Sequence, residues 1–349
     1  MPTASVALVF GLSAAVIAGL FTHAFCKVVI HNGFALDEVS QRSNHSVPTP
    51  RLGGASILLG LGAAAAVLTA TGLIGGPSLS VLMMAFAAGA IGLADDLSAL
   101  QPIPKLVLLS IVAVLSAVLL GPLEVMPIPF IGWVTLPSTV GLLLAAFWLL
   151  AIMNVTNFMD GLNGLVGSFF IIAVMGSALF VGGATGWWVL AAQAAALGFL
   201  FSNAFLGRIF LGDAGSLTLG FLMGAVPLVS TGEERGFWLT PLIVLPLISD
   251  VAITLVRRAA RGARLTEPHR DHLYQRLKAS GWSHQVVAIA VLTSGLFALL
   301  IAASMGPQLT VNPLQYWGAA ILICAVWAAL MIGLRALKPV PRRLEGTLR

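Results

Sequence analysis

The sequence predicts an all-α polytopic membrane protein, built as one bundle of about eleven transmembrane helices. Of its 349 residues, 58% are hydrophobic and only 9% are charged, whereas soluble domains carry roughly 25% charged residues. The mean hydropathy is +1.00, and uninterrupted apolar runs of about 17–25 residues, long enough to cross a bilayer, recur along the chain. These continuous runs exclude the alternating pattern of a membrane β-barrel.

The predicted spans leave no room for a second domain, so residues 1–349 are expected to form a single integral-membrane domain. The first span is expected to stay in the mature protein, because no basic segment of a cleavable signal peptide precedes it. Cys26 and Cys324 lie in apolar runs and are read as small buried hydrophobic residues. The spans are expected at residues 4–26, 52–74, 80–94, 105–121, 138–153, 164–182, 186–206, 215–231, 238–256, 285–304 and 316–335.

Basic residues gather on one side of these spans. With the N-terminus outside, every one of the 18 Lys and Arg residues except Arg235 falls on the inner side. The positive-inside rule therefore predicts a periplasmic N-terminus and a cytoplasmic C-terminus. Because this asymmetry accounts for the formal net charge of +5, no nucleic-acid partner is expected.

The polar segments fall on the same predicted cytoplasmic side. This sorting argues against a structural subunit, and against a transporter or lipid flippase, which would place ionisable residues near the membrane midplane. Asp250 is the exception, since it lies within a span; it is either functional or paired with Arg257 or Arg258. The polar segments, expected to be active-site loops, are residues 32–51, 95–105, 154–163, 207–214 and 257–284.

Asp95 and Asp96 end the third predicted span. Adjacent carboxylates repel each other, and at the C-terminus of a helix they also oppose the helix dipole. A metal ion or a proton-transfer partner would justify that cost. The alternative is a helix end that is simply solvated.

The segment "NVTNFMDGLNGL" (154–165) joins amide side chains to one carboxylate. Asn154, Asn157 and Asp160 are spaced by three, so on a helix they share one face and extend over roughly 9 Å. Asn163 continues the series. The alternative is that the asparagines bridge helices or cap a helix end.

Asp213, in "FLGDAGSLTLG" (210–220), stands where a new helix begins. A helix N-terminus binds anions, and an aspartate there can hold a divalent cation that bridges to a phosphate. The alternative is a plain helix N-cap.

The segment "PHRDHLYQRL" (268–277) carries His269, Arg270 and His272, a set that suits phosphate binding. The alternative is attraction to anionic lipid headgroups. Arg51, in "PTPRLGG" (48–54), adds a weaker indication of phosphate contact. Together the acidic helix ends and the basic loop predict a Mg²⁺-dependent site for a pyrophosphate, at a membrane surface that a lipid substrate can reach.

These motifs, in this order, resemble the polyprenyl-phosphate N-acetylhexosamine-1-phosphate transferases, the glycosyltransferase family 4. This superfamily includes phospho-MurNAc-pentapeptide translocase and the bacterial enzymes that begin O-antigen and teichoic-acid linkage units. The resemblance covers residues 42 to about 280. It implies transfer of a sugar-1-phosphate from a UDP-N-acetylhexosamine to undecaprenyl phosphate, with release of UMP, at the cytoplasmic face of a bacterial inner membrane. It also implies Mg²⁺ as cofactor, with Mn²⁺ as an alternative.

The resemblance also implies roles for single residues. The metal ligands would be Asp213 and Asn157. The catalytic residues would be Asp95, Asp96, Asp160, His269 and His272. The substrate-binding residues would be Lys105, Asn154, Asn203, Phe210, Arg270 and Arg51.

Two departures from the family pattern concern the sugar. Asn163 stands where relatives commonly have Asp, and the histidine-rich signature reads "HRDHLYQ". This version resembles the O-antigen-initiating branch that handles 6-deoxy sugars such as FucNAc or QuiNAc. A CDP-alcohol phosphotransferase is excluded, because Asp160–Gly161 is followed by "LNGLV" instead of the required motif. The sequence leaves open the exact sugar, the polymer, a homodimer, and whether Asp95 is a base or only organises the metal.

Overall fold

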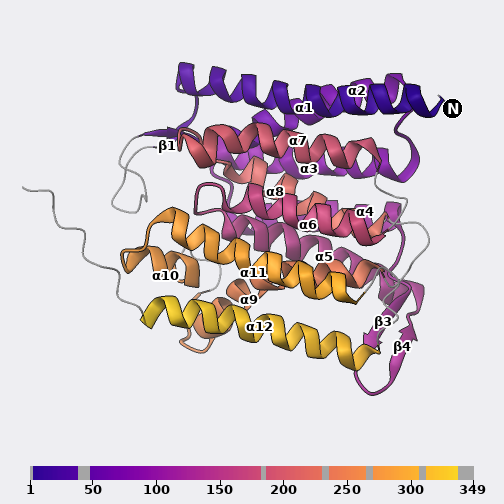
Figure 1. The fold of residues 1–349 in the computed structure, drawn as a ribbon. Coiled ribbons are helices and arrows are strands. Elements are labelled where there is room, and N and C mark those ends of the chain that lie inside the picture. Colours follow the sequence, from indigo (N-terminus) through magenta and orange to yellow (C-terminus); the bar gives the residue numbers. More distant parts are fainter. Residues whose placement is uncertain are drawn as a thin grey trace, which may run out of the picture.

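The computed structural model describes residues 3–37, 48–181, 186–229, 236–264, 270–305 and 312–336. Over these residues the chain forms twelve α-helices and no extensive sheet, which confirms the all-α prediction. The helices lie side by side with roughly parallel axes (Figure 1). They are α1 (Ala4–Asn32), α2 (Gly53–Ala70), α3 (Gly76–Ser98), α4 (Pro102–Leu120), α5 (Ser138–Met159), α6 (Leu165–Val181), α7 (Trp187–Leu200), α8 (Gly212–Ala225), α9 (Leu239–Ala259), α10 (Leu273–Ala279), α11 (His284–Ser304) and α12 (Pro313–Ala336).

Short elements join some of these helices. A π-helical stretch, η1 (Phe201–Phe205), continues α7, and the 3₁₀ turns η2 (Val226–Leu228) and η3 (Gly236–Trp238) lie between α8 and α9. Strand β1 (Leu36–Asp37) pairs antiparallel with β2 (Thr49–Pro50), and β3 (Val125–Ile128) pairs antiparallel with β4 (Gly132–Thr135). The sequence analysis did not predict these hairpins.

Nine helices in the described part of the chain are long and apolar enough to cross a membrane, so the chain is a multi-pass membrane protein. The predicted spans 164–182 and 215–231 are the two that fall short: they form α6, with 17 residues, and α8, with 14. The number of crossings and the orientation of the termini stay predictions.

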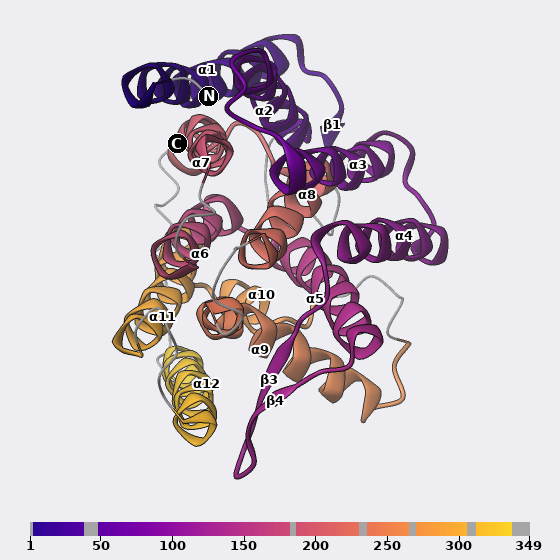
Figure 2. The ribbon, with the colours of Figure 1, turned by 90° about the vertical axis from the view of Figure 1, so that its right-hand side faces the viewer.

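Helix α8 lies at the centre of the bundle, with α2, α3, α5 and α6 around it (Figure 2). Its residues from Ala214 to Ala225 are all buried. Glycines let these helices approach closely: a Cβ on Gly54 would collide with the backbone of Gly215, and one on Gly92 with the backbone of Asp213. Close backbone approach at small residues is the usual way in which membrane helices pack.

Successive long helices alternate in direction. As a result α1, α3, α5, α7, α9 and α12 finish at one end of the bundle, where α2, α4, α6, α8 and α11 begin (Figure 1, left). We call this the site end. The described parts of all the polar segments lie there. The helices also extend further into these segments than the apolar runs indicated, so that Asp95, Asp96, Asn154 and Asn157 are helical and Asp213 lies in the first turn of α8.

Candidate active site

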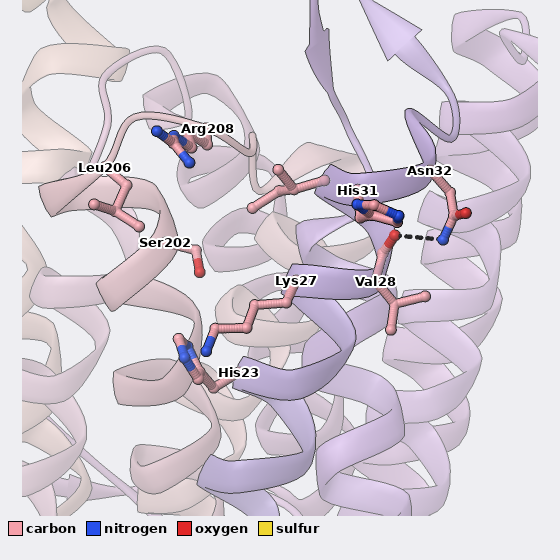
Figure 3. A pocket seen from close by; sticks show the side chains of 9 residues that line it. His23, Lys27, Val28, His31, Asn32, Ser202, Leu206 and Arg208 are labelled. Carbon is pink, nitrogen blue, oxygen red and sulfur yellow. Dashed lines mark hydrogen bonds between the residues drawn. The ribbon is translucent and has the colours of Figure 1, made fainter.

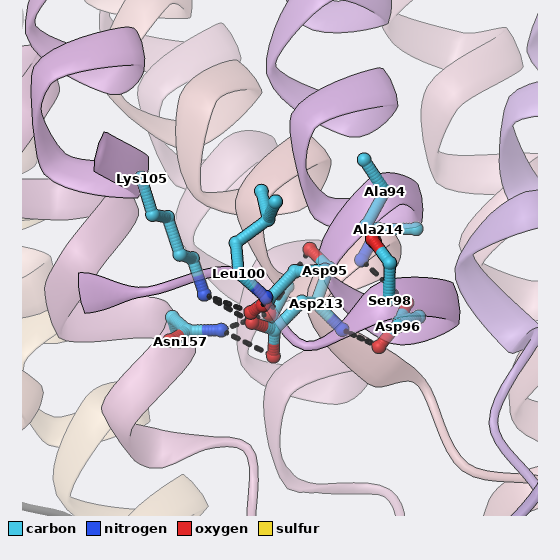
Figure 4. A network of polar contacts seen from close by, with 10 residues as sticks. Ala94, Asp95, Asp96, Ser98, Leu100, Lys105, Asn157, Asp213 and Ala214 are labelled. Atoms are coloured by element: carbon cyan, nitrogen blue, oxygen red, sulfur yellow. Dashed lines mark hydrogen bonds and ion pairs between the residues drawn. The ribbon is translucent and has the colours of Figure 1, made fainter. Parts of the chain in front are cut away.

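Asp96 caps the N-terminus of α8 from the neighbouring helix α3. Its Oδ1 accepts a hydrogen bond from the backbone N–H of Asp213 at 2.8 Å, and its Oδ2 accepts one from Ala214 at 2.9 Å (Figure 4). These N–H groups have no partner within α8, and a carboxylate is favourable at the positive end of a helix dipole. The cost of an acid at the end of α3 is therefore offset by α8, and the solvated-end interpretation is wrong for Asp96.

Lys105 joins two further carboxylates. Its Nζ donates to Asp95 Oδ2 at 2.8 Å and also bonds Asp213 Oδ2, so it forms an ion pair with each. Asp95 Oδ1 accepts from the backbone N–H of Leu100 at 2.6 Å. Helices α3, α4 and α8 thus bring one cation and two anions together in a largely buried position (Figure 4).

Asn157, on α5, holds the other oxygen of Asp213. Its Nδ2 donates to Asp213 Oδ1 and to Ser216 Oγ, both at 2.9 Å. The structure thus places the two predicted metal ligands in contact. Asp213 is not the N-cap of α8, a position that Leu211 occupies.

The donor set suits Mg²⁺. Among the described residues no group of three or more His, Cys, Asp or Glu side chains is placed to hold a metal ion. Mg²⁺, however, is usually bound through one or two carboxylates together with water and substrate phosphates. The Lys105 ammonium shows where a positive charge is stable, between Asp95 and Asp213. For Asn157 to offer an oxygen there, its amide would turn by half a rotation.

Asp160 follows α5 as its C-cap residue. Its carboxylate accepts a hydrogen bond from the backbone of Gly212, which links the end of α5 to the start of α8. Burial, and then the negative charges of Asp213 and Asp96, raise the pKa of Asp160 well above its usual value, while Arg51 opposes the shift. Because its pKa is raised, Asp160 holds a proton more readily than an ordinary aspartate, which suits a carboxyl group that exchanges a proton.

Backbone hydrogen bonds join the segment 48–54 to the segment that leads into α8. The N–H of Phe210 donates to Pro50 O at 2.8 Å, the N–H of Gly53 to Phe210 O at 3.0 Å, and the N–H of Gly54 to Leu211 O at 2.7 Å. This pairing brings the guanidinium of Arg51 within electrostatic reach of Asp96 and Asp160.

The other predicted substrate-binding residues are placed as follows. Asn203 is buried; its Oδ1 accepts from Gly164 N at 2.6 Å and its Nδ2 donates to Ile209 O at 2.7 Å, so it braces two loops. Asn154 bonds Leu150 O within α5, and Phe210 is half-buried. Contact of these residues with a nucleotide-sugar stays a prediction.

Asp250 anchors α10. It is 1% exposed and accepts hydrogen bonds from the N–H groups of Leu273 at 2.9 Å and Tyr274 at 3.2 Å, and its Oδ1 lies 3.3 Å from His272 Nδ1. The pairing of Asp250 with Arg257 or Arg258 was therefore wrong. Both arginines contact Asp271 instead.

Helix α10 is in turn docked on the end of α5. Tyr274 Oη donates to Phe158 O at 3.0 Å, and the His272 ring stacks between Phe158 and Tyr274. The basic motif therefore reaches the site beside Asp160. Arg270 is exposed at its start, and His269 lies outside the described residues.

Comparison with known proteins agrees with this arrangement. Residues 78–231 match the model of the glycosyl transferase family 4. The chain is 30% identical to the decaprenyl-phosphate N-acetylglucosaminephosphotransferase of Mycolicibacterium smegmatis, over 93% of this chain and 88% of the relative. It is 31% identical to the phospho-N-acetylmuramoyl-pentapeptide-transferase of Moorella thermoacetica, over 72% and 85%. The chain belongs to the glycosyl transferase family 4.

Family 4 membership confirms the resemblance predicted from the motifs. A third relative, the probable undecaprenyl-phosphate N-acetylglucosaminyl 1-phosphate transferase of Bacillus subtilis, is 28% identical over 75% of this chain and 74% of its own length. The family model spans the predicted residues from Asp95 to Asp213. Arg51 and the motif 268–277 lie outside the match; backbone hydrogen bonds tie the segment of Arg51 to the start of α8, and Tyr274, in the described part of the motif, bonds the end of α5.

Sequence reasoning missed Ser216 and Tyr274 in this family 4 site, and it singled out Asp250 without finding its partners. Ser216 shares Asn157 with Asp213, Tyr274 docks α10, and Asp250 caps it. The spacing of Ser216, three residues after Asp213 on α8, was a usable signal. The partners of Tyr274 and Asp250 are distant in sequence, so no local pattern indicated them.

Proposed function

We propose that this protein transfers a HexNAc-1-phosphate from a UDP-sugar to undecaprenyl phosphate. An oxygen of the lipid phosphate attacks the β-phosphorus of the UDP-sugar, the anhydride bond between the two phosphorus atoms breaks, and UMP leaves. The product is undecaprenyl-pyrophosphoryl-sugar. The names of the relatives support the reaction class, since they describe transferases of sugar phosphates, several of them to a polyprenyl phosphate.

The observation that carries the proposal is the ion cluster Asp95–Lys105–Asp213, with Asn157 beside it. Joining two phosphates means bringing two anions together, so the site has to supply positive charge. Asp213 and Asn157 would hold Mg²⁺, which would neutralise charge on the pyrophosphate. Lys105, held by Asp95 and Asp213, adds a second positive charge beside that site.

The remaining side chains have roles that follow from their contacts. Asp96 fixes the start of α8 and thereby positions Asp213. The lipid phosphate carries at most one proton, because the second pKa of a phosphate monoester is near 6. Asp160 or Asp95 takes that proton. Arg51, Arg270, His269 and His272 would screen the negative charge of the two substrates.

We further propose that the site end faces the cytoplasm of a bacterial inner membrane, with the N-terminus in the periplasm. The gathering of Lys and Arg residues in the segments of that end supports this orientation. The proposed donors are N-acetylhexosamines, including the 6-deoxy sugars FucNAc and QuiNAc, in the first step of O-antigen or a related surface polysaccharide. Support for this branch comes from Asn163 and the "HRDHLYQ" motif.

A transporter or flippase is not favoured. Its main support was Asp250, an ionisable residue inside a predicted span. In the structure the carboxylate of Asp250 accepts hydrogen bonds from the first N–H groups of α10, those of Leu273 and Tyr274. It therefore holds a helix of the site end. Among the described residues it does not mark a path through the bundle.

The test is UMP release by the purified full-length protein with undecaprenyl phosphate and Mg²⁺. UDP-GlcNAc, UDP-GalNAc, UDP-FucNAc and UDP-QuiNAc are offered in parallel. The control variants are Asp213→Asn, which removes the carboxylate, and Ser98→Ala, which changes an exposed side chain in the last turn of α3. We expect lipid- and Mg²⁺-dependent UMP from at least one donor, lost in Asp213→Asn and kept in Ser98→Ala. UMP release that needs neither lipid nor Asp213 would contradict the proposal.

A further inference from the structure

A cavity of about 560 Å³ opens at the site end, between the last turns of α1 and the π-helical stretch η1 (Figure 3). We call it the α1–η1 cavity. It contains none of the residues assigned above to the active site. Its polar lining consists of His23, Lys27, His31, Asn32, Ser202 and Arg208.

The charged groups that the described residues contribute to the α1–η1 cavity are basic. Lys27 and His31 come from α1, and Arg208 comes from the segment after η1. Among the described residues no acidic side chain lines the cavity, and these three side chains form no ion pair there. The C-terminal dipole of α1 accounts for cations on that helix, but it does not account for Arg208.

Buried polar atoms face the same space without a partner. Ser202 is 1% exposed and its Oγ has no hydrogen bond; Nδ1 of His23 is buried and also has none. A serine within a helix usually bonds the carbonyl one turn earlier, so the orphaned hydroxyl of Ser202 is unusual. Buried polar atoms of this kind call for a partner from outside the chain.

The backbone holds these groups in place. The N–H of Arg208 donates to Ser202 O at 3.1 Å, which fixes the start of the Arg208 side chain beside the serine. Single π-helical turns within an α-helix are frequent at functional sites. Here the turn at Phe201–Phe205 directs Ser202 into the cavity instead of into the helix (Figure 3).

The surroundings point to a lipid. Both walls belong to candidate membrane spans, Ala4–Asn32 and Trp187–Phe205, and the cavity lies at their ends, where headgroups would sit. Apolar side chains beside it are exposed: Phe205 is 80% exposed and Leu206 48%. A basic, hydroxyl-bearing cavity bordered by apolar surface suits an anionic headgroup whose chains continue along the bundle.

We propose that the α1–η1 cavity binds the phosphate group of an anionic membrane lipid. Two sources share this chemistry: the phosphodiester of a glycerophospholipid and the phosphomonoester of a polyprenyl phosphate. Lys27 and Arg208 bind the phosphate by charge, and Ser202 and His23 complete its hydrogen bonds. This inference does not depend on the transfer reaction, because the residues of the cavity are separate from those of the active site and phosphatidylglycerol is no substrate of that reaction.

The experiment is native mass spectrometry of the full-length protein in detergent, titrated separately with phosphatidylglycerol, with undecaprenyl phosphate and with inorganic phosphate. Diacylglycerol, which has no phosphate, is the lipid control. The double variant Lys27→Gln/Arg208→Gln tests the cations, and Ser202→Ala tests the hydroxyl without changing charge. The matched control Arg261→Gln/Arg335→Gln removes two site-end charges outside the cavity.

We expect at least one phosphate lipid to bind about 10- to 30-fold more weakly to the Lys27→Gln/Arg208→Gln variant, at unchanged Tm. Ser202→Ala should weaken the same lipid a few-fold, and the matched control should bind like the wild type. The lipid that responds identifies the source. Equal affinity of the wild type and both cavity variants for both lipids would overturn the proposal. So would a loss confined to inorganic phosphate, which would assign the cavity to a soluble anion.

Discussion

Asp96 and Asp213 are neighbours through the main chain: the carboxylate of Asp96 accepts the N–H of Asp213, while the side chain of Asp213 points to Lys105 and Asn157. The adjacent acids Asp95 and Asp96 therefore do different work. Asp95 belongs to the ion cluster, and Asp96 sets the position of the helix that carries Asp213. Because Asp95 and Asp96 are adjacent in the sequence, the sequence alone did not indicate that they have different roles.

Replacement of Asp96 should act through position. In Asp96→Asn the amide oxygen can still accept one backbone N–H, but the hydrogen bond to the other of the two N–H groups, those of Asp213 and Ala214, is lost. We therefore expect UMP release to fall about 10- to 100-fold, the usual effect of losing a residue that orients a metal ligand. Loss of a helix cap should also cost about 1 kcal/mol of stability. Activity assays and thermal unfolding in detergent measure both, with Ser98→Ala as control. An unchanged rate would show that the cap is dispensable.

Lys105→Met should change the response of the protein to Mg²⁺. Without the ammonium, the carboxylates of Asp95 and Asp213 lie together uncompensated, so the variant should unfold at a lower temperature in EDTA. Added Mg²⁺ should then raise its Tm by more than it raises that of the wild type, because ligand binding stabilises the folded state. Transfer activity should still be lost. Lys278→Met is the control, and equal Mg²⁺ shifts in all three proteins would contradict the expectation.

Asp160 should make stability depend on pH. Its folded pKa is raised by burial and by Asp213 and Asp96, so its contribution to stability is present below the unfolded pKa of about 3.9 and is lost as the pH rises through the folded pKa. In Mg²⁺-free buffer at pH 8, Asp160→Asn should therefore unfold at a higher temperature than the wild type. The difference should shrink at pH 5. A stabilisation that is the same at both pH values would have another cause.

Gly212 is required by both its backbone angle and its surroundings. Its φ is 71°, and a Cβ would collide with Arg51 O and lie 2.7 Å from Asp96 Oδ2. Gly262 has a similar φ of 68° but no atom within 4 Å of its Cβ position. Gly262→Ala should thus cost only the left-handed strain, about 1–2 kcal/mol. Gly212→Ala should lose more stability and nearly all UMP release; equal effects would mean that crowding is unimportant.

Asp250→Asn should loosen α10 without touching the ion cluster. An amide cannot accept all the hydrogen bonds that Asp250 receives from Leu273, Tyr274 and His272, and an unpaired buried donor is costly. We expect faster hydrogen exchange in residues 270–279, with exchange in α8 unchanged. Ser249→Ala, at the adjacent position, serves as control. Protection equal to that of the wild type would show that Asp250 does not hold this helix.

Local patterns in the sequence were sufficient for the fold class and for the gathering of polar segments at one end. Apolar length indicates a membrane helix, and spacing indicates a shared face, as for Asn154, Asn157 and Asp160. Hydropathy does not distinguish a helix that faces lipid from one enclosed by protein. The span predicted at 215–231 therefore starts three residues after the first residue of α8 (Gly212–Ala225) and is longer than that helix. Its true start depends on the cap from Asp96.

The contacts that complete the site are tertiary. Asp250 and Tyr274 reach each other over 24 residues, and Tyr274 reaches Phe158 over 116. Such contacts form only after the helices pack. Packing in turn depends on glycines such as Gly54 and Gly92, because a side chain at either position would collide with the backbone of α8. No periodicity of the sequence encodes that information.

The pairing of residues 50–54 with residues 210–211 is made by peptide groups alone. A substitution in either segment leaves these backbone hydrogen bonds intact, provided that the new side chain fits. Insertion or deletion of one residue would instead shift every donor away from its acceptor and turn Arg51 away from the acids. This part of the protein should therefore tolerate changes of chemistry far better than changes of length.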